Sequence, residues 1–327
     1  MERIQDMGTH FSPALRSRRS LTWRDVAAWL LCISFFLMIP MEFASLEWKQ
    51  TAQGLWRVEN GHAEGLVFAL IWLLWAACNV GGGILFVVLG LITRFQYERG
   101  SGGALTGRDF VYYFSWLQLS TMMFMLIVES FHVNQGWFSL LIPYLPHGLM
   151  ILCALWLFKG RLSELGFRRI RAEKAGFAFV AVVVAYGLTY FFLDPFVTNP
   201  VANWFHLDLG SWREESISAG IKQAAEVGFI SVGGQILLIG VIGPIAEEMV
   251  FRGLIMGGIS RRLGTGVAIV MSALLFALFH ADITYLAPLF VLGLVLGGLY
   301  GVFRSLWVPI LFHIINNTAS VLFDLFR

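Results

Sequence analysis

The chain has 327 residues, of which 57% are hydrophobic and 13% charged, and its formal net charge is +2. Its mean hydropathy is +0.72. A soluble domain carries about 25% charged residues, so this composition excludes a protein of two soluble domains and indicates a polytopic membrane protein. The small net charge, with no basic patch interleaved with aromatic residues outside the loops that flank the membrane spans, also sets nucleic acid aside as a partner.

The hydrophobic runs are long enough for membrane-spanning helices, which need about 20 mostly apolar residues. Lipid offers no partners for unpaired backbone groups, and the runs are too long for barrel strands, so we expect an all-α transmembrane bundle. Nine spans are predicted in chain order, with eight as the alternative if one short run re-enters the membrane: 26–45, 66–92, 110–131, 137–158, 175–193, 227–247, 266–282, 285–303 and 306–326.

Basic residues alternate between successive loops, and this alternation predicts the orientation of the chain. Lys and Arg gather in the N-terminal tail, after the second, fourth and sixth spans, and at Arg304 after the eighth, whereas the other connections are poor in them or acidic. Lys and Arg favour the cytoplasmic side of a membrane. We therefore expect a multi-pass integral membrane protein with a cytoplasmic N-terminus and an external C-terminus, placed in the inner or plasma membrane if the cell is bacterial.

The stretch 159–174 is the most charged in the chain and divides it. The expected organisation is a cytoplasmic tail at 1–25, an accessory region of four transmembrane helices at 26–158, a basic cytoplasmic loop at 159–174 and a catalytic transmembrane core at 175–327. The external connection 194–222 contains Pro and Trp residues and is expected to lie partly along the membrane interface, where Trp is favoured.

Ionisable residues at membrane depth are costly and are therefore candidate functional residues. The first such group is Glu247, Glu248 and Arg252. On a helix, Glu248 and Arg252 share a face and can form an ion pair. Glu247 is rotated by about 100° from Glu248 and is expected to lack that partner, which suits a general base in an apolar pocket. The alternative interpretation is a pair of carboxylates at a helix end, held by basic neighbours.

Two further groups lie downstream, namely His280 four residues after Phe276, and His313 four residues before Asn317. A single intramembrane His is more often a packing residue than a catalyst, but these groups and the acidic pair lie within one short part of the chain. Glu247 and His280 could activate a water molecule, while His313 and Asn317 could donate hydrogen bonds to an oxyanion. The set predicts water-dependent hydrolysis of an acyl bond.

Other unusual residues in the spans receive structural interpretations. Gly293, Gly297 and Gly301 repeat at four-residue spacing, which allows two helices to approach closely. His147 follows Pro143 and Pro146 and is expected to cap carbonyl groups that the prolines leave free.

Three motifs resemble those of the CAAX protease and bacteriocin-processing (CPBP) family of intramembrane proteases, which includes abortive-infection-like members. They are Glu-Glu-x-x-x-Arg at 247–252, Phe-x-x-x-His at 276–280 and His-x-x-x-Asn at 313–317. The resemblance covers about 160–327 and is densest over 240–320, whereas the first part of the chain shows none. Every motif position is filled, which favours an active member over a degenerate one.

The resemblance implies an endopeptidase that hydrolyses a peptide bond of a membrane-associated peptide or protein tail. Its partners would be membrane lipid and that substrate. Glu247 with His280 would activate the attacking water, and His313 with Asn317 would stabilise the oxyanion. The alternatives are a non-catalytic immunity or binding protein on the same fold, and a transporter with a proton relay. The lack of an internal repeat argues against the transporter.

By the same resemblance, Glu248 and Arg252 would orient the site. The family is usually classed with metalloproteases, although a metal-free, glutamate-dependent mechanism has also been argued for it. Glu247, His280 and His313 are the candidate ligands if a divalent metal such as Zn²⁺ binds, because two His and one Glu form a known zinc set. The same three groups can hold a water molecule without metal, so one divalent ion and none are both open.

The positions of Glu247 and His280 create a geometric requirement. Glu247 is predicted near the cytoplasmic end of the sixth span, whereas His280 lies about 14 residues into the seventh, a rise of about 20 Å. The two side chains can meet if the sixth span continues past Glu248 with Arg252 still helical, or if the seventh span is short and tilted. We expect the first arrangement.

Overall fold

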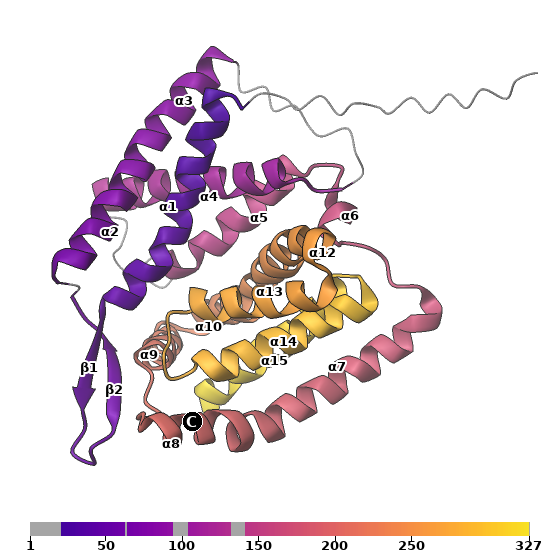
Figure 1. The fold of residues 1–327 in the computed structure, drawn as a ribbon. Coiled ribbons are helices and arrows are strands. Elements are labelled where there is room, and N and C mark those ends of the chain that lie inside the picture. The colour runs from indigo at the N-terminus through magenta and orange to yellow at the C-terminus, as the bar shows by residue number, and fades with distance from the viewer. Residues whose placement is uncertain (1–20, 63, 94–103, 132–140, 327) are drawn as a thin grey trace, which may run out of the picture.

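The computed structural model describes residues 21–62, 64–93, 104–131 and 141–326 (Figure 1). Most of the expected N-terminal tail, and the start of the fourth predicted span, therefore lie outside the described residues. Within the described ranges the chain is helical almost throughout, with one two-stranded antiparallel sheet. The prediction of an all-α, polytopic membrane bundle is confirmed.

The first part of the chain forms a helical group around α1 and α4, which pack on each other. Its elements are α1 (Trp23–Ala44), β1 (Leu46–Gln50), β2 (Trp56–Asn60), α2 (Leu66–Ala76), η1 (Ala77–Gly81), α3 (Gly82–Ile92), α4 (Gly107–Ser130), η3 (Ile142–Tyr144) and α5 (Leu145–Leu157). Thr22 and Thr106 each begin a long helix with a capping box, in which Asp25 and Asp109 complete the hydrogen bonds to free backbone N–H groups.

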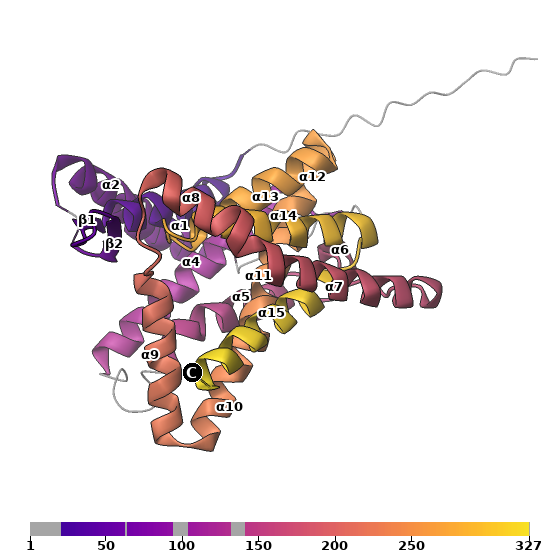
Figure 2. The same ribbon diagram turned by 90° about the horizontal axis from the view of Figure 1, so that it is seen from below.

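The second part forms a layered group in which α13, α14 and α15 lie side by side with α7 along their edge (Figure 1). Its elements are α6 (Leu162–Leu165), α7 (Ala172–Leu193), η4 (Asp194–Thr198), α8 (Asn199–Phe205), α9 (Trp212–Val227), α10 (Phe229–Leu237), η5 (Leu238–Ile242), α11 (Gly243–Glu248), η6 (Met249–Met256), α12 (Gly257–Leu263), α13 (Thr265–Phe279), α14 (Leu286–Phe303) and α15 (Trp307–Phe326). Seen from below, α9 and α10 form a helical hairpin beside α15 (Figure 2).

All nine predicted spans correspond to apolar helices. In the described ranges, seven helices are long and apolar enough to cross a membrane, and the spans predicted at 137–158 and 266–282 correspond to the shorter apolar helices Ile142–Leu157 and Thr265–Phe279. The number of complete crossings therefore stays a prediction.

Two connections differ from the sequence interpretation. The connection 194–222 is largely helical, because η4 and α8 extend α7 and α9 follows as a separate helix. The strands β1 and β2 form a hairpin between α1 and α2 that the sequence interpretation did not include. The hairpin is tied to the α8–α9 connection through the backbone of Trp56, which bonds to His206 and Asp208 at 2.7 and 2.8 Å.

Glycines allow α13 and α14 to approach closely, as predicted from their spacing. A Cβ atom at Gly293 would lie 2.9 Å from the Cα atom of Ala273, and one at Gly297 would lie 3.0 Å from a side-chain carbon of Ile269. Larger side chains at these two positions would force the helices apart. The packing interpretation of this ridge is therefore confirmed.

The helix that carries Glu247 runs from Phe229 to Leu263 as one continuous apolar segment, composed of α10, η5, α11, η6 and α12. The expectation that this span continues past Glu248 with Arg252 still helical is confirmed. Wide π-helical turns precede and follow α11. Such turns accommodate a proline that lacks an N–H group, here Pro244, and they are frequent at functional sites.

Candidate active site

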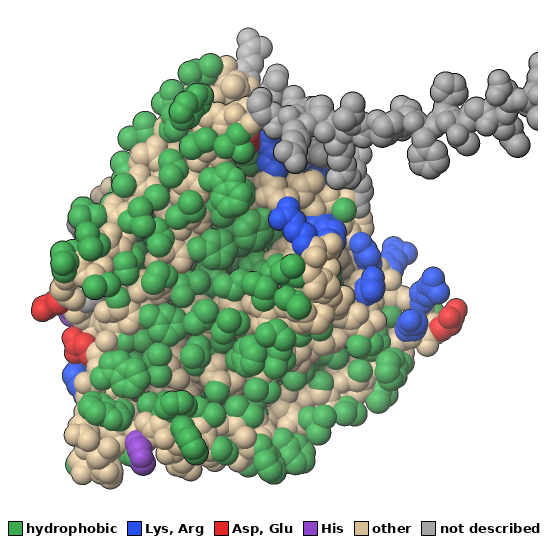
Figure 3. Space-filling model, viewed as in Figure 1, with side chains coloured by type: hydrophobic (Ala, Val, Ile, Leu, Met, Phe, Trp, Pro, Cys, Tyr) green, Lys and Arg blue, Asp and Glu red, His purple; other side chains and the backbone are tan. Residues whose placement is uncertain are grey.

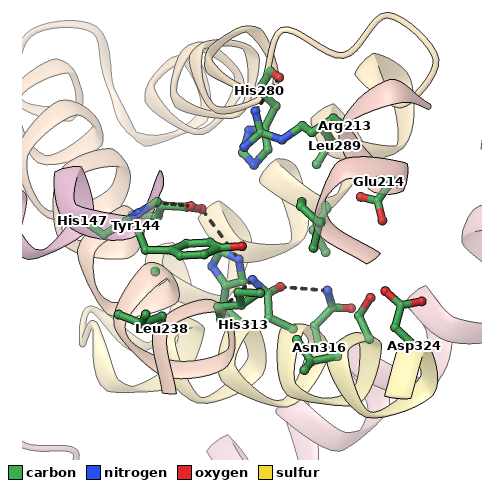
Figure 4. Close-up of a pocket in the computed structure, with 18 of the residues that line it drawn as sticks. Tyr144, His147, Arg213, Glu214, Leu238, His280, Leu289, His313, Asn316 and Asp324 are labelled. Carbon is green, nitrogen blue, oxygen red and sulfur yellow. Dashed lines mark hydrogen bonds and ion pairs between the residues drawn. The ribbon is translucent and has the colours of Figure 1, made fainter. Parts of the chain in front are cut away.

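A polar pocket of about 200 Å³ lies between the C-terminal helices and α5. Its walls come from η3, α5, α9, η5, α11, α14 and α15, together with the end of α13 (Figure 4). The polar side chains that line it are Tyr144, His147, Arg213, Glu214, Glu247, His280, His313, Asn316, Asn317, Ser320 and Asp324. Four of the six predicted site residues thus face one pocket, and the other two, Glu248 and Arg252, are fully buried beside it.

Glu248 is held by two partners. Arg252 Nη1 donates a hydrogen bond to Glu248 Oε1 at 2.8 Å, and His313 Nδ1 lies 2.9 Å from the same oxygen. Arg252 Nη2 also donates to the carbonyl oxygen of Gly293, and its guanidinium group lies 4.7 Å from the centre of the Phe276 ring. The predicted ion pair of Glu248 and Arg252 is confirmed. The buried charges of Glu248 and Arg252 thus compensate each other, and the contacts with His313, Gly293 and Phe276 support the pair, as burial of two charges requires.

Glu247 faces the pocket without an arginine partner, as its rotation on the helix predicted. Its Oε1 atom lies 3.2 Å from His147 Nε2, and its Oε2 atom lies 3.8 Å from His313 Nε2. Among the described residues, Oε2 is buried and has no hydrogen-bond partner. Because an ionised carboxylate only accepts hydrogen bonds, His147 Nε2 is the donor, and Oε2 is left available to a molecule in the pocket.

His147 was wrongly interpreted as a cap for free carbonyl groups. Pro143 and Pro146 lie in the first turns of η3 and α5. There a backbone N–H group has no partner within the helix, so a proline frees no carbonyl for His147 to cap. His147 instead projects from α5 toward Glu247 (Figure 4). In the sequence, His147 is marked only by its position one residue after a helix-initiating proline. That position is a weak indication of a residue in the active site.

His280 directly follows the last residue of α13, and its imidazole is oriented by that helix. His280 Nδ1 lies 2.7 Å from the carbonyl oxygen of Phe276. A carbonyl only accepts hydrogen bonds, so Nδ1 carries the hydrogen and Nε2 is the nitrogen left for a reaction partner. His280 and Glu247 line the same pocket and interact electrostatically, although no direct hydrogen bond joins them among the described residues.

The chain reverses immediately after His280. Ala281 has a φ of +48°, a left-handed conformation that a β-branched residue rarely adopts. Buried Asp282 then accepts hydrogen bonds from the Ser211 hydroxyl and from the backbone N–H of Tyr285. Arg213 of α9 donates to the carbonyl oxygen of His280 at 2.9 Å. These contacts fix the position of His280 from both sides of the reversal.

His313 and Asn317 lie one turn apart on the same face of α15, as their spacing predicted. His313 directs Nδ1 to Glu248 and Nε2 toward Glu247. Asn317 donates one amide hydrogen to the carbonyl oxygen of Ile239 at 3.3 Å, so its second N–H is not used in that bond. The two side chains thus present nitrogen atoms to the same pocket.

The sequence interpretation did not include six further polar residues of the pocket: Tyr144, Arg213, Glu214, Asn316, Ser320 and Asp324. Tyr144 extends across the pocket between His280 and His313, and Glu214 faces Asp324 from the opposite side (Figure 4). Desolvation raises the pKa of the Glu214 carboxyl, and the charges of Asp282 and Asp324 raise it further. The end of the pocket at Glu214 and Asp324 is rich in carboxylates.

The three candidate metal ligands, Glu247, His280 and His313, can be compared with a metal site. In the described ranges, no group of three or more His, Cys, Asp and Glu side chains is arranged so that it could hold a metal ion. The arrangement does not fit a three-ligand site, and no step proposed below passes through a metal.

Comparisons with known proteins agree with the motifs. Residues 230–319 match the family of the type II CAAX prenyl endopeptidase Rce1-like proteins. The chain is 25% identical over 146 residues to "Putative membrane peptidase YdiL" of Bacillus subtilis, covering 45% of the chain and 58% of that protein. It is 33% identical over 96 residues to "Membrane-embedded CAAX protease MroQ" of Staphylococcus aureus, covering 28% of the chain and 39% of that protein. No solved structure matches the chain.

The chain thus aligns with less than two thirds of the length of either relative. All three motifs lie inside the matched segment 230–319. The resemblance to the CPBP family is therefore confirmed over the part of the chain that forms most of the pocket.

Proposed function

We propose that this chain, a relative of the CAAX proteases over residues 230–319, is an intramembrane endopeptidase. It would hydrolyse a peptide bond in a membrane-associated peptide or protein tail. The observation that carries the proposal is the Glu247 carboxylate, which presents to a polar pocket among apolar helices an oxygen that has no hydrogen-bond partner among the described residues. An ionisable group kept at such a place is expected to serve chemistry, and a carboxylate beside a reactant water acts as a general base. The printed names of both relatives favour peptide hydrolysis as the reaction class.

In the proposed reaction, Glu247 Oε2 accepts a proton from a water molecule while the water oxygen attacks the carbonyl carbon of the peptide bond. His147 holds the other carboxylate oxygen, Oε1, and so fixes the orientation of Glu247. His280 presents Nε2 as an acceptor for the second hydrogen of the water, because its Nδ1 hydrogen is bound to the carbonyl of Phe276. The protonated Glu247 then returns its proton to the amine that leaves.

The tetrahedral intermediate carries a negative oxygen that needs hydrogen-bond donors. His313 would supply an Nε2–H group as the imidazolium ion, in which both ring nitrogens carry a hydrogen, because its Nδ1 hydrogen is already donated to Glu248. Asn317 supplies its second amide hydrogen, and the Tyr144 hydroxyl is a further donor lining the pocket. Preorganised donors of this kind act on the charge that develops in the transition state.

Glu248 and Arg252 have a positioning role in this proposal. Arg252 neutralises Glu248, and Glu248 in turn fixes the tautomer of His313 by accepting its Nδ1 hydrogen. This arrangement leaves His313 Nε2 directed into the pocket. Neither Glu248 nor Arg252 touches the reacting atoms.

The test compares membrane proteomes of cells that carry wild-type protein, Glu247→Gln, or the control Glu226→Gln. Glutamine keeps the shape of Glu247 and removes its basicity, whereas Glu226 lies exposed at the end of α9, away from the pocket. We expect uncleaved precursors to accumulate with Glu247→Gln alone, while the melting temperatures of the purified proteins stay similar. Identical cleavage products from wild type and Glu247→Gln would overturn the proposal and favour the non-catalytic binding function.

A further inference from the structure

A second hollow lies at the opposite end of α13 and α14 from the polar pocket, and it has a volume of about 230 Å³. The polar pocket contains residues near the end of α13 and the start of α14, whereas this hollow contains Thr265 at the start of α13 and Tyr300 near the end of α14. Its polar lining also includes Arg168, Arg261 and Arg304. We call it the basic hollow.

The three arginines of the basic hollow bring positive charge without a matching carboxylate. In the described part of the chain, no carboxylate lies within ion-pair distance of Arg168, Arg261 or Arg304. The acidic residue of the lining, Glu164, is already paired with Arg161 at 2.7 Å. Among the described residues, these three positive charges around one space are therefore not compensated by an ion pair.

Tyr300 lines the same space as the three arginines. Arg168 donates its Nε hydrogen to the carbonyl oxygen of Ser163 at 2.9 Å, and its two Nη groups are not used in that bond. The Tyr300 hydroxyl packs against the backbone of Gly166, where a Cβ atom would lie 2.6 Å from the hydroxyl oxygen. Forked guanidinium groups and a hydroxyl in one space match the oxygens of a phosphate group.

The position of the basic hollow indicates where such a phosphate would come from. Lys and Arg side chains gather along one edge of a broad hydrophobic surface, beside α12 and α6 (Figure 3). The basic loops on this side are those that the distribution of Lys and Arg assigns to the cytoplasm. The cytoplasmic leaflet contains anionic lipids, and basic pockets between membrane helices on that side bind their headgroups.

We propose that the basic hollow binds a phosphate group, supplied in the membrane by the headgroup of an anionic lipid. The site is separate from the polar pocket, and it requires no peptide hydrolysis. The proposal therefore stands or falls independently of the proposed protease activity.

The test uses the full chain purified in detergent and measures lipid binding by native mass spectrometry, with phosphatidylglycerol, phosphatidylcholine and inorganic phosphate as probes. The test variant carries Arg261→Gln and Arg304→Gln. The matched control carries Arg169→Gln and Arg262→Gln, which remove the same charge at neighbouring exposed positions that do not line the hollow. We expect phosphatidylglycerol to bind about tenfold or more weakly to the test variant and almost normally to the control.

The outcomes separate a site from general surface charge. Preference for phosphatidylglycerol over phosphatidylcholine, lost only in the test variant, supports a lipid headgroup as the ligand. Competition by inorganic phosphate with the same dependence on Arg261 and Arg304 supports the phosphate site and identifies the free ion as a second source. Equal loss of binding in both variants, or no preference for an anionic probe in wild type, would overturn the proposal.

Discussion

His147 of α5 lies 3.2 Å from Glu247 of α11, with its Nε2 atom directed at the carboxylate oxygen Oε1. The two residues are 100 positions apart in the chain. The contact joins the region predicted as accessory, 26–158, to the predicted catalytic core, and it makes α5 part of the pocket wall. The first four apolar segments therefore have at least one direct connection to the proposed chemistry.

This contact predicts that His147 positions the general base. We expect His147→Ala to lower kcat by about a hundredfold, because Glu247 would lose the hydrogen bond that fixes its orientation, while KM changes little. His147→Gln, which can still donate a hydrogen bond, should recover part of the rate. His62 in an exposed loop provides the control, since His62→Ala should leave kcat unchanged. Equal rates for wild type and His147→Ala would contradict the positioning role.

The buried pair of Glu248 and Arg252 predicts a loss of stability. Arg252→Gln leaves the Glu248 carboxylate without its cation in a fully buried position. Breaking a buried pair in this way costs about 3–5 kcal/mol. The measurement is thermal or denaturant unfolding of the purified protein in detergent.

A control for this loss is Glu215→Gln, which breaks the pair of Arg57 and Glu215 at the protein surface. The Glu215 side chain is 58% exposed. An exposed pair contributes about 0–1 kcal/mol, so its loss should barely shift the transition. Similar shifts for Arg252→Gln and Glu215→Gln would show that the buried pair does not stabilise the bundle.

Much of the site could be predicted from helical periodicity alone. Glu248 with Arg252, and His313 with Asn317, are each four residues apart, so a helix places them on one face whatever the rest of the fold does. The turn of Glu247 away from Glu248 follows from the same geometry. These relationships are local, and the helices at membrane depth maintain them.

The remaining features depend on contacts between distant segments. The hydrogen bond between His147 and Glu247 requires α5 to pack against α11, and no periodicity within either helix specifies that packing. The hairpin of β1 and β2 was missed because it is short, and because its pairing with the α8–α9 connection is equally non-local. The connection 194–222 was interpreted as an external loop, whereas the π-helical turn η4 keeps the chain helical at Pro195.

Tyr144 provides a test of the oxyanion proposal that leaves the charged residues intact. We expect Tyr144→Phe to lower kcat by about tenfold to a hundredfold with little change in KM, because the lost hydroxyl would act on charge that develops only in the transition state. Tyr190→Phe is the control, since Tyr190 is exposed on α7. A change confined to KM would place Tyr144 in substrate binding instead.

The cofactor question has a direct measurement. Because Glu247, His280 and His313 do not form a three-ligand group, we expect the purified protein to contain well below one divalent ion per chain. Cleavage should then persist in the presence of EDTA and 1,10-phenanthroline. One zinc ion per chain that is lost in His280→Ala, together with inhibition by both chelators, would contradict the metal-free reaction.

The two pockets at opposite ends of α13 and α14 predict which face of the membrane each one meets. If the basic side is cytoplasmic, α9 and the carboxylate-rich end of the polar pocket face outward. Lys222 on α9 and Arg262 on α12 are both exposed, and the native residues Cys32, Cys78 and Cys153 are buried. Single cysteines at positions 222 and 262 can therefore report the two faces without removal of the native thiols.

We expect Lys222→Cys to react with a membrane-impermeant maleimide in intact cells, and Arg262→Cys to react only after the membrane is permeabilised. This result would mean that a peptide reaches Glu247 from the external side, past Arg213 and Glu214 of α9, while the basic hollow meets the cytoplasmic leaflet. The reverse labelling pattern would invert both assignments at once. The leaflet that supplies the phosphate in the lipid-binding proposal would then change, because both pockets are fixed to the same helices.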